Sequence, residues 1–122
     1  MTDLELFTKA FIDAMYLSET GDDDNLISAD AQLSDNARAD LEADCRSFWR
    51  RARPYVAAED QRRYTDYSAA AHAGHDFWLT RNGHGTGFWD GDWPVHGDKL
   101  TQLAQAYGEI DVYEGDDGLI HV

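Results

Sequence analysis

The first half of the chain repeats apolar residues with the period of an α-helix. In residues 3–18 these positions lie three or four apart, at Leu4, Phe7, Phe11 and Met15. In residues 35–52 they follow the same spacing, at Leu41, Cys45, Phe48 and Ala52. Ser34 precedes the second stripe, where its hydroxyl can accept a hydrogen bond from a backbone N–H of the first turn. The pattern predicts two amphipathic helices that pack into a core.

A third helix is expected over residues 56–74. Pro54 is predicted to break or restart the preceding helix, because proline lacks the N–H that a helix interior requires. Tyr64, Tyr67 and Ala71 fall on one side of the new segment. Gly74 is a natural helix terminator, since glycine accepts the left-handed conformation found just beyond many helix ends.

The next stretch, "HDFWLTRNGHGTGFWDG" at residues 75–91, changes to a period of two. Asn82-Gly83 favours a tight turn, because both residue types tolerate positive φ. Two registers are open: one pairs Leu79 with Phe88, and the other pairs Phe77 with Phe88. In either register the two Phe-Trp pairs face each other across strands and supply much of the packing. The stretch is therefore predicted to be a β-hairpin.

The remaining chain predicts one more helix and a second strand pair. Residues 99–108 carry an apolar helical stripe that ends at Gly108, and residues 109–122 read as strand, turn and strand. The expected fold class is α+β. Three N-terminal helices are followed by a β-hairpin, a helix and a β-hairpin, giving a four-stranded antiparallel sheet. No repeat or linker divides the chain, so 1–122 is taken as a single domain.

The net charge of the chain narrows the possible functional classes more than the pattern of apolar and polar residues does. The chain has 24 Asp and Glu against 10 Lys and Arg, for a net charge of −14. Such a field repels nucleic acid and anionic lipid and attracts basic partners. Direct nucleic-acid binding and a membrane partner are not expected. No apolar run is long enough to span a bilayer and no signal peptide is evident, so the protein is expected in the cytoplasm. The acidity also has an ordinary explanation, which is solubility.

Histidine and aspartate residues between 72 and 92 leave a metal-dependent hydrolase as an alternative. A zinc site would use the H-x-x-H pair His72 and His75, with Asp76 and His84 nearby. A magnesium-dependent nuclease would use His84 as general base, with carboxylate ligands from Asp76, Asp90 and Asp92. Against the zinc site, Gly74 is expected to end the helix between the two histidines. Against the nuclease, the acidic surroundings oppose a polyanionic substrate. No catalytic residue, metal or cofactor is therefore assigned.

If the 75–91 stretch has a role beyond folding, four polar residues are its candidates. Its glycines and Asn82 are explained by a turn, and its aromatic pairs by packing across strands. The residues that neither explanation covers are His75, Asp76, Arg81 and His84. We expect any function of this stretch to lie in this polar cluster.

Two segments, "AGHDFWLTRNGHGTGFWDG" at 73–91 and "GDKLTQLAQAYGEIDVYEGDDGLIHV" at 97–122, carry a family resemblance. They resemble a family of small acidic proteins encoded by bacteriophages and by bacterial genomes that carry prophages. The resemblance covers most of residues 1–122 and is strongest over 73–122. It implies a role in phage biology inside the bacterial cytoplasm. The family has no established activity, so the resemblance supplies no catalytic residues.

These observations favour a non-enzymatic protein whose acidic surface binds a basic site on a host protein. In its specific form the protein mimics nucleic acid and inhibits a host defence nuclease or CRISPR effector. The candidate contacts are the carboxylates of Asp22, Asp23, Asp24, Asp90, Asp92, Glu114, Asp116 and Asp117. Another alternative is a homo-oligomeric phage accessory or structural module, in which Trp78, Trp89 or Trp93 forms the interface.

Overall fold

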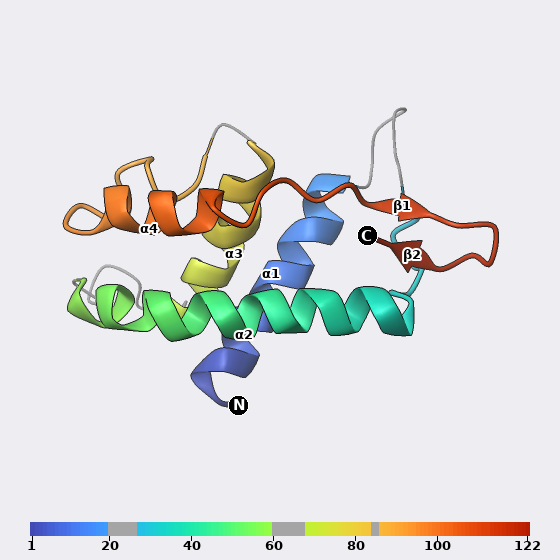
Figure 1. Cartoon of the computed structure of the whole chain (residues 1–122), viewed down its shortest axis with the longest axis horizontal. Coiled ribbons are helices and arrows are strands. Elements are labelled where there is room, and N and C mark those ends of the chain that lie inside the picture. Colours follow the sequence, from blue (N-terminus) through green and yellow to red (C-terminus); the bar gives the residue numbers. More distant parts are fainter. Residues whose placement is uncertain (20–26, 60–67, 84–85) are drawn as a thin grey trace.

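A computed structural model describes residues 1–19, 27–59, 68–83 and 86–122 of the chain. In these residues it contains four helices and two short strands (Figure 1). The helices are α1 (Asp3–Glu19), α2 (Asp35–Ala58), α3 (Ala69–Asn82) and α4 (Gly97–Gln105). The strands are β1 (Tyr113–Glu114) and β2 (Ile120–His121). Among the described residues, no helix has both the length and the apolar character needed to cross a membrane.

The predicted four-stranded sheet is wrong. The sheet in the described residues has only two strands, β1 and β2, which pair antiparallel with Tyr113 opposite His121 and Glu114 opposite Ile120. None of the described residues between 75 and 91 belongs to a strand, because residues 75–82 continue α3 and residues 86–91 are irregular. The protein is therefore mostly helical, with one small strand pair near the C-terminus (Figure 1).

The first two predicted helices are confirmed. Phe7, Phe11 and Met15 of α1 are fully buried. Ser34 caps α2, since its Oγ accepts a hydrogen bond from the N–H of Ala37 at 3.0 Å. The predicted core positions of α2 are also buried, at Leu41, Cys45, Phe48 and Ala52.

Pro54 does not end α2, contrary to the prediction. The helix continues through Pro54 to Ala58, with Ala52 and Val56 buried on either side of it. Proline removes one helical hydrogen bond, but its own side chain is exposed and the buried face is uninterrupted. The third helix predicted at 56–74 is consequently wrong in its bounds. Its residues 60–67, including Tyr64 and Tyr67, lie outside the described residues.

The predicted hairpin at 75–91 is replaced by the second half of α3. Ser68 caps the start of this helix by accepting from the N–H of Ala71, and Gly83 ends it with φ of 64°. Asn82-Gly83 is thus a helix C-terminus, because the positive φ that suits a tight turn also suits the residue after a helix. Buried residues occur on every side of α3, so its sequence shows no helical stripe.

Gly74 lies inside α3 and permits its close packing against α1. The most extensive contact between two elements is that of α1 with α3. A Cβ atom at Gly74 would collide with the backbone carbonyl of Phe7, so only glycine fits at this crossing. The prediction that Gly74 ends a helix is therefore wrong, and its absent side chain has a packing role.

Aromatic side chains from three helices fill the centre of the molecule. The rings of Phe48 on α2 and Phe77 on α3 stack at 4.0 Å between centroids. Phe7 of α1 lies 5.8 Å from each of them. The thiol of Cys45 is fully buried beside this cluster, and burial raises its pKa far above the usual range of a thiol.

The C-terminal segment is joined to the start of α2. The N–H of Ser34 donates to the carbonyl of Ile120 at 2.9 Å, and the N–H of Ile120 donates to the carbonyl of Gln32 at 2.8 Å. Together with the bridge between Leu33 and Ile120, these bonds fix β2 beside the N-terminal end of α2 (Figure 1). Residues 27–44 and 109–122 therefore form one end of the molecule.

The opposite end is held by a buried carboxylate. Glu59, directly after α2, accepts hydrogen bonds from the N–H groups of Val95 and His96 at 3.2 and 2.6 Å. These two residues immediately precede α4, and an acidic group is favourable at the positive end of a helix dipole. Glu59 thus ties the start of α4 to the end of α2.

Replacing Gly74 with alanine tests the crossing of α1 and α3. In an unobstructed helix interior, Gly→Ala stabilises by up to about 1 kcal/mol. At Gly74 the added methyl group collides with backbone, so we expect destabilisation by about 1–3 kcal/mol. Urea unfolding followed by far-UV circular dichroism measures the sign of the effect.

Gly83→Ala is the matched control. Its φ is positive but a Cβ there meets nothing within 4 Å, so only the backbone penalty of about 1 kcal/mol is expected. A Gly74→Ala protein that is more stable than wild type would contradict the close packing of these helices.

Candidate functional site

Three polar residues of α3 line up along one face of the helix. His72, Asp76 and Thr80 are spaced four apart, and all three are buried. Residues so spaced lie above one another on a helix, so they form a continuous polar stripe. The stripe faces the segment 86–96, which it holds through the contacts of Asp76 and Thr80. At one end of the stripe, Thr80 Oγ1 accepts a hydrogen bond from the N–H of Phe88 at 3.2 Å.

Asp76 is the centre of this arrangement. Its Oδ2 accepts a hydrogen bond from Trp93 Nε1 at 2.7 Å and lies 3.2 Å from His72 Nε2. Its Oδ1 lies 3.2 Å from His75 Nδ1. Burial alone would raise the pKa of Asp76, but the contacts with His72, His75 and Trp93 outweigh it and hold the pKa at about 2. The carboxylate is therefore charged throughout the physiological pH range.

The pKa of His75 moves in the opposite direction, upward. Its hydrogen bond to Asp76 raises its pKa above the usual value, although partial burial opposes the change. The negative charges of Asp76 and Asp90 act in the same direction as the hydrogen bond. His75 consequently holds a proton more readily than a free histidine does.

A second carboxylate reaches the stripe from the segment 86–96. Asp92 Oδ2 lies 3.4 Å from His72 Nε2, and the side chain of Asp92 is 50% exposed. One donor atom each from His72, Asp76 and Asp92 lies within 4.8 Å of the others, a grouping found among the described residues that could hold a cation. The ring of Trp93 covers the imidazole of His72 at 5.1 Å between centroids. We call these three residues the His-Asp cluster.

The structure divides the polar cluster predicted from the sequence. His75 and Asp76 are in contact, whereas Arg81 points to other partners and His84 lies outside the described residues. His72, which the sequence indicated only as half of an H-x-x-H pair, lies at the centre of the His-Asp cluster and contacts both Asp76 and Asp92. The signal that identifies it is the four-residue spacing to Asp76, which has meaning only if the helix continues through Gly74.

Arg81 is buried and holds the turn after α4. Its Nε donates to the carbonyl of Gly108 at 2.8 Å, and one terminal nitrogen donates to the carbonyl of Tyr107 at 3.2 Å. The other terminal nitrogen forms an ion pair with Asp44 of α2 at 3.0 Å. The guanidinium also lies over the rings of Phe77 and Tyr107. These contacts engage all three nitrogens of the guanidinium, which gives Arg81 a structural role.

The carboxylates proposed as partner contacts do not form a single patch. Glu114, Asp116 and Asp117 lie in or between β1 and β2, whereas Asp90 and Asp92 lie in the segment 86–96 at the opposite end of the molecule (Figure 1). Asp22, Asp23 and Asp24 lie outside the described residues. Two of the acids in or between β1 and β2 also make internal contacts. Glu114 accepts a hydrogen bond from the N–H of Ser28, and Asp117 contacts the ring of His121.

Two of the three tryptophans considered for an interface are unavailable for it. Trp78 is completely buried and Trp93 is 3% exposed, while Trp89 is 43% exposed. Trp78 donates its indole N–H to Ser18 Oγ at 2.6 Å, as a core tryptophan does when its polar atom has a partner. An interface built on Trp78 or Trp93 is therefore wrong for the folded chain.

The end formed by residues 27–44 and 109–122 has its own hollow. A cavity of about 510 Å³ lies there between α2 and the segment that precedes β1. Four carboxylate residues line it, at Asp40, Asp44, Glu109 and Asp111. The remaining lining is largely apolar, with Leu41, Ile110 and Val122. Among the described residues, no Lys or Arg lines this hollow. Arg81 forms an ion pair with Asp44 but is not part of the lining.

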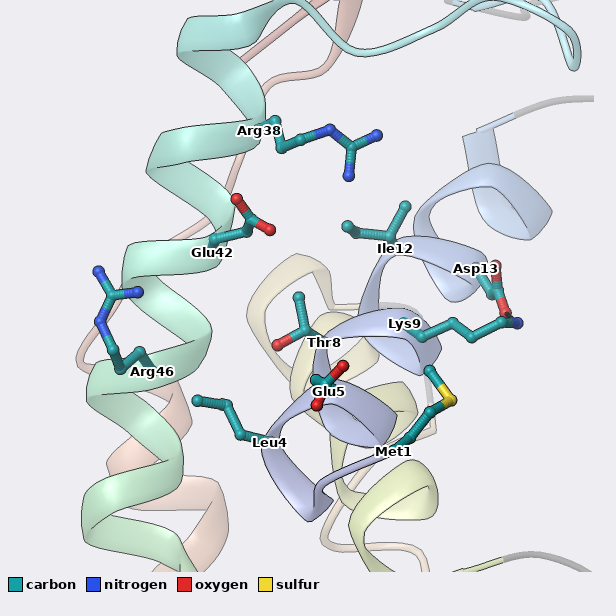
Figure 2. Close-up of a pocket in the computed structure, with 10 residues that line it drawn as sticks. All are labelled: Met1, Leu4, Glu5, Thr8, Lys9, Ile12, Asp13, Arg38, Glu42 and Arg46. Atoms are coloured by element: carbon teal, nitrogen blue, oxygen red, sulfur yellow. Dashed lines mark hydrogen bonds and ion pairs between the residues drawn. The ribbon is translucent and has the colours of Figure 1, made fainter.

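A second hollow, between α1 and α2, differs in its charge. Its lining contains three acids, Glu5, Asp13 and Glu42, and three bases, Lys9, Arg38 and Arg46. Figure 2 shows Arg38 extending from α2 toward α1, while Lys9 turns back to Asp13 on its own helix. The lining charges cancel, so this groove offers no electrostatic preference for a charged partner.

The role of Arg81 is tested by two substitutions. Arg81→Met removes every polar contact of the side chain, and we expect it to cost about 2–3 kcal/mol, because two carbonyls and a half-buried carboxylate lose their donor. Arg81→Lys keeps the charge but not the fork, so we expect an intermediate loss. Urea unfolding measures both effects.

The control for Arg81 is Arg51→Met, because the side chain of Arg51 is exposed, and it is expected to change stability by less than about 0.5 kcal/mol. An equal loss of stability at both positions would contradict a structural role for Arg81.

Comparison with family models, with curated proteins and with solved structures finds no match for this chain. The resemblance to small acidic phage proteins therefore stays a prediction, and the functional argument depends on the geometry of the chain itself.

Proposed function

We propose that the protein binds a basic surface of another protein through its acidic end, defined as residues 27–44 and 109–122. The observation that supports this proposal most is the segregation of charge. Residues 27–44 contain five Asp and Glu with one Arg, and residues 109–122 contain five with no Lys or Arg. Packing of β2 against Leu33 brings these two segments together, so ten acids and one base share one end of the molecule.

The charges along α2 follow the same division. Its first part carries four acids and Arg38, at Asp35, Asp40, Glu42 and Asp44. Its second part carries four bases, at Arg46, Arg50, Arg51 and Arg53. Asp35 also lies in the first turn, where a negative charge suits the positive end of the helix dipole. If acidity served solubility alone, no such separation would be required.

The hollow at the acidic end suits a cationic side chain. Among the described residues, Asp40, Glu109 and Asp111 form no ion pair, so their charges are available to a partner. Leu41 and Ile110 supply apolar lining beside them. Arginine and lysine have apolar stems and charged ends, which match a hollow with both characters. Opposite charges also raise the rate at which partners meet.

The specific form of this proposal follows from the phage resemblance. In that setting the partner is a host protein in the bacterial cytoplasm whose basic groove normally holds nucleic acid. The acidic end then takes the place of the phosphate backbone and competes with it. No catalytic step is required of the protein in this role.

The proposal is tested with a short arginine-rich peptide as the basic probe. A triple variant, Asp40→Asn, Glu109→Gln and Asp111→Asn, removes the carboxylates of the hollow that have no internal ion pair. We expect wild type to bind the peptide with an affinity that falls steeply with salt, and the variant to bind about tenfold more weakly, from roughly 0.5 kcal/mol per lost pair. Fluorescence anisotropy of a labelled peptide measures both quantities.

A second triple variant separates position from net charge. Asp3→Asn, Asp13→Asn and Asp98→Asn remove three exposed carboxylates outside the acidic end, so both variants change the net charge from −14 to −11. We expect the control to retain most of the affinity. Equal losses in the two variants would show that only total charge matters and would contradict a defined binding face.

A further inference from the structure

The His-Asp cluster has donor spacings that fit a bound metal ion. His72 Nε2 lies 3.2 Å from Asp76 Oδ2 and 3.4 Å from Asp92 Oδ2. Zinc bonds to imidazole nitrogen and carboxylate oxygen are about 2.0–2.1 Å long, so neighbouring ligands of a tetrahedral site are about 3.3–3.4 Å apart. These two distances are close to this edge, and the donor oxygens of Asp76 and Asp92 lie within 4.8 Å of each other.

The type of donor selects the class of metal. Zinc binds both imidazole nitrogen and carboxylate oxygen, which are the donor types of this cluster. Calcium and magnesium prefer oxygen ligands alone and higher coordination numbers. An imidazole nitrogen at the centre of the group therefore favours a divalent transition metal over either of these.

Charge balance favours a cation at the same point. Asp76 is 2% exposed and Asp92 brings a second negative charge to within reach of the same imidazole. Two carboxylate oxygens therefore lie beside one imidazole, and one of the two carboxylates is buried. A divalent ion at this point places positive charge beside the buried carboxylate of Asp76, which lowers the cost of keeping that carboxylate out of water.

The residues around the cluster hold the ligands in position. Trp93 Nε1 donates to Asp76 Oδ2 at 2.7 Å, and His75 Nδ1 contacts the other oxygen of the same carboxylate at 3.2 Å. Hydrogen bonds of this kind orient the carboxylates that ligate metals. The helix fixes His72 and Asp76 relative to each other, whereas Asp92 comes from the following segment and is 50% exposed. Asp92 therefore gives the site access to solvent.

We propose that His72, Asp76 and Asp92 bind a zinc ion, with a fourth coordination position open to water. Three protein ligands and one open position are the arrangement found in zinc sites that act on a bound molecule. The site lies on α3 and the segment 86–96, away from the acidic end, so it does not depend on the partner-binding proposal. It differs from the magnesium site considered from the sequence, because Asp90 is replaced by His72.

Zinc itself is the probe in the test. Wild type is purified without a histidine tag, freed of metal with a chelator, and titrated with zinc chloride by isothermal calorimetry. We expect one zinc ion per chain. Titration with Co²⁺ is expected to give the intense visible absorption of a tetrahedral site with nitrogen and oxygen ligands.

Two variants locate the site. Asp92→Asn removes the exposed ligand, so the fold is retained, and we expect zinc affinity to fall by about tenfold or more. Asp117→Asn is the matched control, because it removes another carboxylate that contacts a histidine, His121, at 3.0 Å. This control is expected to bind zinc as wild type does.

Three results would overturn the site. These are no zinc binding by wild type, equal binding by wild type and Asp92→Asn, or loss of binding only in Asp117→Asn. Far-UV circular dichroism of each variant separates loss of a ligand from loss of the fold. Peptide binding by the acidic end is measured independently, so failure of either proposal leaves the other standing.

Discussion

A helix that is buried on all sides can keep polar side chains only if other parts of the molecule supply their partners. α3 is such a helix, with buried residues from Ala70 to Arg81 on every face. Its packing against α1 is possible because Gly74 presents no side chain to Phe7. Its polar residues then determine where the C-terminal half of the chain lies. Asp76 and Thr80 bind the segment 86–96, and Arg81 binds the turn after α4.

This constraint also keeps the two candidate sites apart. The His-Asp cluster is formed where α3 meets the segment 86–96. The end of this segment is fixed by Glu59, which accepts a hydrogen bond from the N–H of His96. The acidic end is formed where β2 meets the start of α2. The first site has few charges and is largely buried, so it suits one small ion. The second has many exposed charges, so it suits a large basic surface.

The sequence predicted α1 and most of α2 because each has one apolar face and a recognisable start. The sequence did not predict the extent of α3, since a helix with buried residues on every side has no apolar stripe. Asn82-Gly83 also suits a helix end as well as a turn. The same feature hides the His-Asp cluster, because the four-residue spacing of His72 and Asp76 has meaning only in a helix that continues through Gly74. Which loop residues approach the helix could not be predicted, because the contacts of Asp92 and Trp93 depend on tertiary packing.

The buried thiol of Cys45 is a natural probe of how often the core opens. It is the chain's single cysteine, it is completely enclosed, and burial keeps it protonated and unreactive. A thiol reagent can reach it only when α2 separates from its neighbours. The rate of labelling therefore records how often the core opens, without any mutation or added dye. A ligand that holds the helices together slows that rate in proportion to the open population it removes.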